Sequence, residues 1–350
     1  MKRMDDMVRK KTLCLVVLLF LFPFQAKAMA VHTNQKYEYK VLVEDLLQLR
    51  WKYGKEIRIQ PIGSSHAGRK IWAVKLGRGK KNIVIIGSHH GREWITSMLV
   101  MNMLETYADA YRRKTCIGPF STSQLDRVSI WFVPMLNPDG VTIQQNHLRL
   151  FPEFQRQWLS KMNGNETDFT RWKANGLGVD LNRQYPSGWK EISETQPSYR
   201  FYKGKKPLES DEVKAITDFV EKIKPLTAIA YHSAGREIYW QFHNDENFER
   251  DRFLANKIAK LTGYKLGVPP KKSVGGGFTD WFITTYRKPS FTIEISYLVG
   301  ERNPPISVFK EEWKRNKLVG ITLAHEAEKL FMEKHTLSKR GNTIKNKCKR

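Results

Sequence analysis

The stretch from residue 82 to residue 94 reads NIVIIGSHHGREW. Its first half is apolar and rich in β-branched residues, which predicts a buried strand over 82–87. A helical pattern follows over 94–111, so the strand leads into a helix. His90 and Glu93 lie between the two elements, and imidazole and carboxylate are both good zinc ligands. The stretch predicts an α/β unit with two candidate metal ligands at the end of its strand, although this short pattern also occurs by chance.

The alternation of strands and helices continues along the chain. Further strands are predicted over 57–59, 70–75, 128–134, 226–231 and 290–295, and further helices over 39–53, 210–222, 249–261 and 306–332. This alternation, without a repeat or a linker, favours an α/β fold: a single domain with a mixed, largely parallel twisted sheet flanked by helices. The stretch 147–190 lacks periodicity, and a long irregular segment inside a compact domain is often a functional loop region.

Three other places carry candidate site residues. His232 follows the strand over 226–231, and Asp180 lies in the irregular stretch. Glu294 lies inside the apolar strand over 290–295, where an unpaired charge is costly. Each residue alone has an ordinary structural explanation, as a core histidine, a turn aspartate or a salt-bridged glutamate. Because strand ends collect site residues along one edge of an α/β sheet, we expect all three to lie close to His90 and Glu93.

The composition adds a strong positive charge. The 350 residues include 60 Lys and Arg against 35 Asp and Glu, which gives a net charge of +25. Hydrophobic residues make up 41% of the chain, so a disordered or fibrous protein is excluded. A positive field of this size favours polyanionic partners, namely nucleic acid, an anionic membrane or an acidic cell-wall polymer. Charge alone does not choose among them.

The N-terminal residues have the pattern of a secretory signal peptide. Basic residues precede an apolar run over 13–24, and Ala26-Lys27-Ala28 offers a cleavage site. We predict a signal peptide over 1–28, with a second cleavage site after Ala30 and an uncleaved anchor as the alternative. Cleavage after Ala28 removes six basic and two acidic residues and leaves 54 against 33, a net charge of +21. The expected product is secreted, has no stable membrane span and does not meet nucleic acid.

The motifs, taken in this order, resemble the zinc carboxypeptidase family. The resemblance rests on His90-Gly91-Arg92-Glu93-Trp94, Asn137-Pro138-Asp139-Gly140, Gly178-Val179-Asp180-Leu181-Asn182-Arg183, His232-Ser233 and Thr292-Ile293-Glu294. It covers nearly all of the mature chain and implies a catalytic domain over 37–332, followed by a basic tail over 333–350. The segments 171–175, 180–185 and 237–240 are most similar to the bacterial branch that cleaves γ-D-glutamyl bonds to diamino acids in peptidoglycan peptides.

The resemblance implies a catalytic zinc centre. His90, Glu93 and His232 would bind one Zn²⁺, and three protein ligands with an open fourth position are typical of a catalytic zinc site. Asp180 would hold the other ring nitrogen of His90. Glu294 would be the general base, which takes a proton from water and delivers one to the leaving amine.

The resemblance also implies residues that bind the substrate. Arg92 would help to polarise the scissile carbonyl. Asn182 and Arg183 would bind a substrate carboxylate, both of whose oxygens a planar guanidinium can hold. Thr279 would line the pocket for the residue after the cut, where a small polar side chain suits a polar diamino acid.

The chain departs from the family pattern in two places. Lys173 stands where animal digestive members have arginine, and lysine can stabilise an oxyanion as a point charge but without a bidentate fork. The substrate-capping tyrosine of those enzymes has no counterpart, since the matching position falls near Lys272. These departures favour a specialised peptide substrate over ordinary protein C-termini.

Three functions are compatible with these features. The leading prediction is an exported zinc peptidase that acts on peptidoglycan stem peptides and is held near the cell wall by an anionic polymer. A general metallocarboxypeptidase that removes C-terminal residues from peptides would use the same site residues. The third hypothesis is a protein that binds the cell wall or an anionic polymer and has only a vestigial metal site, but the presence of Glu294 argues against it.

Overall fold

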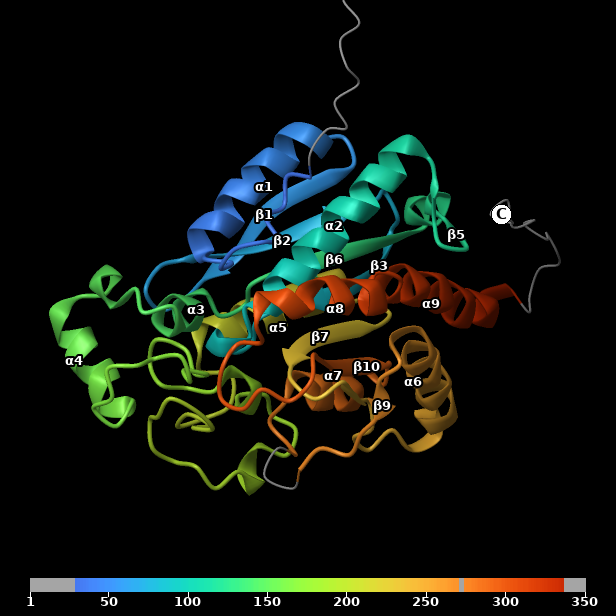
Figure 1. Cartoon of the computed structure of the whole chain (residues 1–350). Helices are drawn as coiled ribbons and strands as arrows, with labels where there is room; N and C mark the ends of the chain where they lie inside the picture. Colours follow the sequence, from blue (N-terminus) through green and yellow to red (C-terminus); the bar gives the residue numbers. More distant parts are fainter. Residues whose placement is uncertain (1–28, 271–273, 337–350) are drawn as a thin grey trace, which may run out of the picture.

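Eight strands form one mixed sheet at the centre of the molecule (Figure 1). The computed structural model describes residues 29–270 and 274–336, with side chains as far as residue 330. The predicted signal peptide over 1–28, Lys272 and most of the predicted tail over 333–350 lie outside the described residues. In spatial order the strands are β1 (Ile57–Ser64), β2 (Lys70–Leu76), β6 (Val128–Val133), β3 (Lys81–Ile86), β7 (Ala228–Ser233), β10 (Ser290–Ile295), β8 (Glu237–Tyr239) and β9 (Lys265–Leu266).

The four central strands run parallel to one another. The pairs β6–β3, β3–β7 and β7–β10 are parallel, as is β8–β9 at one edge. The pairs β1–β2, β2–β6 and β10–β8 are antiparallel. This arrangement confirms the predicted α/β fold with a mixed, largely parallel sheet. The four central strands therefore all end on the same side of the sheet, so that their carboxyl ends lie next to one another.

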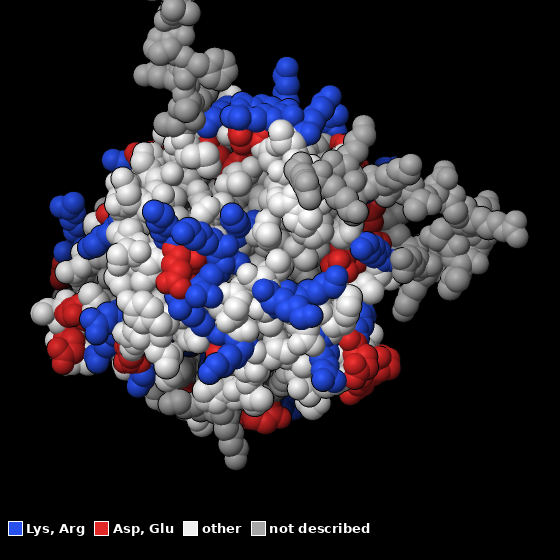
Figure 2. Space-filling view, turned by 45° about the vertical axis from the view of Figure 1, so that its right-hand side comes forward, with Lys and Arg blue, Asp and Glu red and all other residues white. Residues whose placement is uncertain are grey.

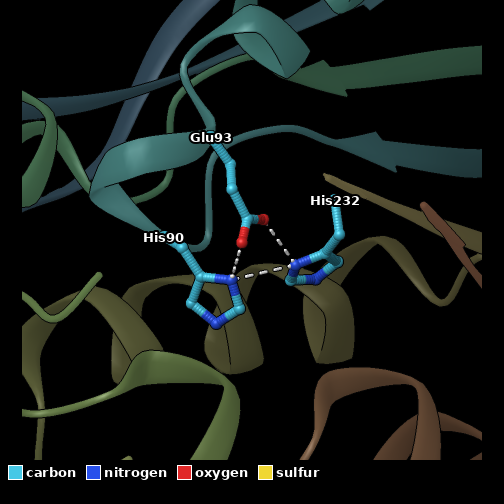
Figure 3. A group of neighbouring side chains, drawn as sticks. All are labelled: His90, Glu93 and His232. Carbon is cyan, nitrogen blue, oxygen red and sulfur yellow. Dashed lines mark hydrogen bonds and ion pairs between the residues drawn. The ribbon is translucent and has the colours of Figure 1, made fainter. Parts of the chain in front are cut away.

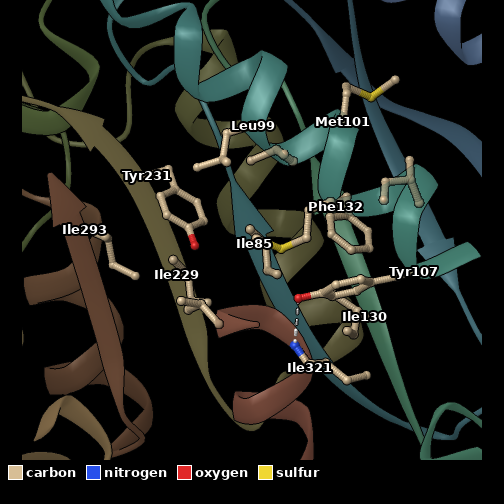
Figure 4. Packing of buried hydrophobic residues seen from close by; sticks show 14 of the residues in the cluster. Ile85, Leu99, Met101, Tyr107, Ile130, Phe132, Ile229, Tyr231, Ile293 and Ile321 are labelled. Carbon is tan, nitrogen blue, oxygen red and sulfur yellow. Dashed lines mark hydrogen bonds between the residues drawn. The ribbon is translucent and has the colours of Figure 1, made fainter. Parts of the chain in front are cut away.

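Helices cover both faces of the sheet. Successive residues of β3 point to opposite faces, and both sets are buried. Ile83 and Ile85 face a large core with α1 (Tyr39–Tyr53), α2 (Ile95–Arg113), α6 (Phe248–Thr262) and α9 (Val319–Thr336). Val84 and Ile86 face a second core with α5 (Asp211–Ile223) and α7 (Phe278–Tyr286). A strand that is buried on both faces reads as a continuous apolar run, which explains the sequence of β3. Figure 4 shows part of the first core, including Ile85.

Two predictions about secondary structure are wrong. The stretch 147–190 is not wholly irregular, because it contains α4 (Glu153–Met162). Only Gln155, Leu159 and Met162 of this helix are buried, so its apolar pattern is short. Leu159 and Met162 belong to a small separate core with Trp172, and this core supports the long loop that follows.

The predicted helix over 306–332 is two helices, α8 (Phe309–Asn316) and α9, preceded by a short 3₁₀ turn. The chain turns at Lys317 and Leu318 so that α9 can pack closely on the sheet. A Cβ atom on Gly320 would lie 2.8 Å from Ile85, which shows how tight this contact is. The hydroxyl of Tyr107 supports the break, since it donates to the carbonyl of Lys317 and accepts from the N–H of Ile321.

The visible face of the molecule carries many basic side chains. In Figure 2, Lys and Arg side chains are spread over the whole of the visible face, with Asp and Glu in smaller groups. Within residues 29–270 and 274–336, no helix is long and apolar enough to cross a membrane.

The break between α8 and α9 generates a stability prediction. Tyr107→Phe would remove the partner of the buried N–H of Ile321 and of the part-buried carbonyl of Lys317. We expect it to lower the free energy of unfolding by about 1–3 kcal/mol in urea denaturation. Tyr231, in the same core (Figure 4), has a buried hydroxyl with no hydrogen-bond partner among the described residues. Tyr231→Phe should therefore be neutral or stabilising, and an equal loss in both variants would contradict the role given to the Tyr107 hydroxyl.

Candidate metal centre and active site

The site lies at the edge of the sheet where the parallel strands end. His90 follows β3 after a short loop, and the 3₁₀ turn Gly91–Glu93 places Glu93 beside it. His232 lies near the end of β7, which pairs with β3. Glu294 lies on β10 directly opposite His232 in the register of the β7–β10 pair. Parallel pairing therefore brings together residues that are far apart in the sequence.

The side chains of His90, Glu93 and His232 point toward one another (Figure 3). The Glu93 carboxylate lies 2.8 Å from Nδ1 of His90 and 3.0 Å from Nδ1 of His232. The two Nδ1 atoms are 3.1 Å apart, and the three residues offer ligand atoms that all lie within 4.8 Å of one another. Two imidazoles and one carboxylate that converge in this way can hold a zinc ion. Three protein ligands leave a further position for water or substrate.

Burial and mutual charge set the protonation of these groups. Burial opposes ionisation of Glu93, but the charge of His90 and hydrogen bonds from both histidines hold the pKa of Glu93 well below its usual range. Burial lowers the pKa of His232, and contact with Glu93 opposes that shift. An ionised carboxylate beside a neutral imidazole is the protonation state that metal ligands need.

Asp180 connects His90 to Lys173. Its Oδ1 atom lies 3.1 Å from Nε2 of His90, and its Oδ2 atom lies 3.2 Å from Nζ of Lys173. Burial would raise the pKa of Asp180, but the charges of Lys173 and His90 hold it well below its usual range. Burial lowers the pKa of Lys173, and the charge of Asp180 opposes this. The carboxylate therefore orients the histidine ring and keeps the buried lysine paired.

A cavity of about 200 Å³ opens beside the three candidate ligands. The predicted site residues that line it are His90, Lys173, Asn182, Arg183, Thr279 and Glu294. The sequence prediction missed other lining residues, namely Tyr239, Trp240, Gln241, Asp280 and Thr292. Asp280 could have been found from its position beside Thr279, because it is the one charged residue of a largely apolar helix.

The residues of this cavity hold one another in place. The Asn182 side-chain oxygen accepts from the N–H of Phe278, and the Arg183 guanidinium donates to the Asn182 carbonyl. The hydroxyl groups of Thr279 and Thr292 lie 2.8 Å apart. Burial raises the pKa of Asp280 to about 7. The lining is thus polar and carries both a buried guanidinium and an acid.

Glu294 faces the same cavity as His90. Burial and the charge of Glu93 raise the pKa of Glu294 well above its usual range, while the charges of Lys173 and Arg92 act in the opposite direction. A raised pKa makes a carboxylate a stronger base, which suits it to take a proton and return it within one reaction.

Arg92 lies beside the candidate ligands but does not line the cavity. Its guanidinium lies 3.4 Å from a carboxylate oxygen of Glu301 and donates to the carbonyl of Arg171 at 3.2 Å. Arg200 pairs with the same carboxylate oxygen of Glu301. The sequence offered no signal for Arg200 or Glu301, since both lie outside regular elements and far apart along the chain.

Asn137 holds the segment that carries Lys173. It follows β6, and its side-chain amide donates to the carbonyls of His89 and Ala174, at 3.1 and 3.2 Å. Its side-chain oxygen accepts from the N–H of Gly140 at the start of α3 (Pro138–Gln144). One residue therefore joins the loop after β3 to the loop of Lys173.

Glu212 supports the same segment from the other side. The amide of Asn175 donates to Oε2 of Glu212 at 3.1 Å, while Oε1 has no hydrogen-bond partner among the described residues. Glu212 is fully buried at the start of α5. Burial, with a contribution from the charge of Asp139, raises the pKa of Glu212 to about 8.

The chain is similar to known proteins over most of its length. The sequence matches the zinc carboxypeptidase family over residues 42–318. It is 33% identical over 301 residues to the γ-D-glutamyl-L-diamino acid endopeptidase 1 of Lysinibacillus sphaericus, covering 84% of this chain and 73% of that protein. It is also 33% identical over 184 residues to metallocarboxypeptidase A of Trichophyton rubrum, covering 50% of this chain and 40% of the fungal protein.

Solved structures share the fold of this chain. The crystal structure of thrombin activatable fibrinolysis inhibitor superposes with a TM-score of 0.70 at 19% sequence identity, covering 88% of this chain and 78% of that one. The chain belongs to the zinc carboxypeptidase family. It is a metallopeptidase of a zinc family, and the three converging side chains are a group that could hold a metal ion.

The raised pKa of Glu212 generates a prediction about stability and pH. The group binds its proton more tightly in the folded chain than in the unfolded chain, so its contribution is full below about pH 4.5 and is lost as the pH rises toward 8. Glu212→Gln removes this dependence. We expect the variant to gain stability relative to the parent between pH 5 and pH 8, at up to about 1.4 kcal/mol per pH unit. Urea denaturation of parent and variant at the two pH values measures the free energies of unfolding. A difference between the two proteins that stays the same at both pH values would contradict the prediction.

Proposed function

We propose that this protein is an exported zinc peptidase that hydrolyses γ-D-glutamyl bonds to diamino acids in peptidoglycan stem peptides. The observation that carries the proposal is the cavity beside the candidate ligands, which combines Arg183 with the acid Asp280 and the small polar Thr279. A diamino acid presents a carboxylate and a second amino group, and this lining offers a partner of opposite charge for each. The activity for which the relative from Lysinibacillus sphaericus is named supports the same substrate class.

In the proposed reaction, His90, Glu93 and His232 hold the zinc ion. When bound there, zinc supplies Lewis-acid chemistry, which polarises a carbonyl and makes water more acidic. Asp180 fixes the ring of His90 through its Nε2 atom. These four residues therefore set the ligand geometry before substrate arrives.

Glu294 acts as the general base and then as the general acid. It takes a proton from the attacking water and gives one to the leaving amine. Burial and the charge of Glu93 raise its pKa, which makes its carboxylate a stronger base. Lys173 and Arg92 place positive charge on the side of the scissile carbonyl, where it stabilises the developing oxyanion.

Asn182 and Arg183 bind the carboxylate of the leaving residue. The Arg183 guanidinium is buried and lines the cavity, so its attraction for a carboxylate is weakly screened by solvent. Thr279 lies on the same wall and leaves room for a polar side chain. The signal-peptide pattern over 1–28 supports export, and the positive charge would attract the enzyme to an anionic cell-wall polymer.

The roles of Glu294 and Glu93 can be separated by two matched substitutions. Glu294→Gln should lower kcat by about 10²–10⁴-fold but leave the zinc content at one ion per chain. Glu93→Gln should lose both activity and zinc, because it removes the one anionic ligand. Zinc content and peptide hydrolysis measured on the same preparations test this. A Glu294→Gln variant that cleaves as fast as the parent would overturn the assigned mechanism.

The alternative function is that of a general metallocarboxypeptidase, which the name of the fungal relative supports. The two functions differ in the class of peptide that is cleaved. We expect cleavage of a γ-D-glutamyl-diaminopimelate peptide at least about tenfold faster, in kcat/KM, than of an ordinary blocked dipeptide. Assays on both peptides measure this ratio. Cleavage of the ordinary dipeptide alone would identify a general carboxypeptidase.

A further inference from the structure

Beside the active site, one carboxylate is surrounded by cationic and hydroxyl donors. Glu301 pairs with Arg200 and Arg92 and accepts a hydrogen bond from the hydroxyl of Tyr199 at 3.3 Å. Burial would raise the pKa of Glu301, but the charges of Arg92 and Arg200 hold it below its usual range. We call Arg92, Tyr199, Arg200 and Glu301 the carboxylate cluster. It has the donors of a carboxylate-binding site, and a residue of the chain itself occupies it.

The carboxylate cluster adjoins the catalytic groups but lies outside the cavity that contains Arg183. None of its four residues lines that cavity. Arg92 lies between the candidate ligands His90 and Glu93, and the Tyr199 carbonyl accepts from the N–H of Lys173. If the cavity holds the leaving residue, the acyl part of the substrate extends away from it. The carboxylate cluster lies outside the cavity but next to the catalytic groups, and we infer that it faces the acyl side of the scissile bond.

The ring of Phe201 joins the two parts of the site. Arg200 and Lys173 each lie 4.9 Å from its centre. The N–H of Phe201 donates to Asp180, and its φ angle is +66°, a conformation that a bulky residue adopts only under constraint. The backbone at Arg200 is thus fixed relative to Lys173 and Asp180, so the arginine has a defined position beside the catalytic groups.

The charges of the carboxylate cluster do not balance. Two guanidinium groups, those of Arg92 and Arg200, share the single carboxylate of Glu301. Nearby Arg171 is engaged with Asn163 through two hydrogen bonds, and Lys173 is paired with Asp180. Arg200 and Glu301 have side chains that are 36% and 37% exposed, so a second carboxylate can approach from solvent. The cluster therefore carries a net positive charge with access for an anion.

A γ-linked glutamyl residue brings such an anion to the acyl side. Its scissile carbonyl is that of the side chain, so its α-carboxylate is free and is separated from the scissile carbonyl by Cγ, Cβ and Cα. An ordinary α-linked peptide has a neutral amide in the corresponding part of the chain. We propose that Arg200 binds the free α-carboxylate of the γ-glutamyl residue and so selects γ-linked substrates, while Arg92 beside it faces the scissile carbonyl. This inference rests on the proposed function and names the residue that determines acyl-side specificity.

The test compares two substrates that differ by one charge. L-Ala-γ-D-Glu-L-Lys carries the free α-carboxylate, and L-Ala-γ-D-isoglutaminyl-L-Lys carries a neutral α-carboxamide of the same shape. We expect the parent enzyme to favour the carboxylate by at least about tenfold in kcat/KM. Arg200→Gln should abolish this preference by slowing cleavage of the carboxylate substrate alone. The control Arg252→Gln, which removes an exposed arginine of α6, should retain it.

A second variant distinguishes binding from a structural role. Glu301→Gln removes the internal carboxylate and should increase the preference for the carboxylate substrate several-fold, because Arg200 then has no internal carboxylate to compete for it. Equal losses on both substrates in either variant would mean that the cluster only ties two loops together, and would overturn the proposal. No preference in a parent enzyme that cleaves both γ-linked peptides would overturn it and leave the proposed function intact. Cleavage of α-linked peptides alone would overturn both.

Discussion

The site depends on the parallel pairing of β3, β7 and β10. This pairing puts His232 opposite Glu294 and places both next to the loop that carries His90 and Glu93. A slip of one residue in β10 would turn Glu294 to the other face of the sheet. Such a slip is opposed by the core on one face, which Phe291, Ile293 and Ile295 fill. The packing of the apolar residues therefore fixes the position of Glu294, the proposed general base.

The sequence was sufficient to predict the sheet and the residues that converge on its edge. Runs such as β3 are apolar on both faces, and α1 begins and ends where periodicity placed it. His90, Glu93 and His232 could be predicted because strand ends meet at one edge and because their order matched a known family. The prediction failed for α4 and for the break before α9, where a helix is short or a turn is imposed by close packing against the sheet.

Contacts between irregular segments could not be predicted at all. Glu301 meets Arg92 and Arg200 only because three separate loops come together, and no periodic pattern records such a meeting. Glu212 looks like an ordinary acid in the first turn of a helix, a common position that normally favours ionisation. Its burial beside Asn175 reverses that expectation and raises its pKa. Chemistry that depends on burial requires the packed structure.

The lysine at position 173 fits a site in which one carboxylate serves two groups. Asp180 uses Oδ1 for His90 and Oδ2 for Lys173 and the N–H of Phe201. A bidentate arginine would compete for both oxygens, whereas an ammonium group needs only one. Because burial lowers the pKa of Lys173, its charge depends on the carboxylate that also orients His90. The proposed zinc ligand His90 and the proposed oxyanion group Lys173 are thus coupled through Asp180, and loss of this one carboxylate would disturb both at once.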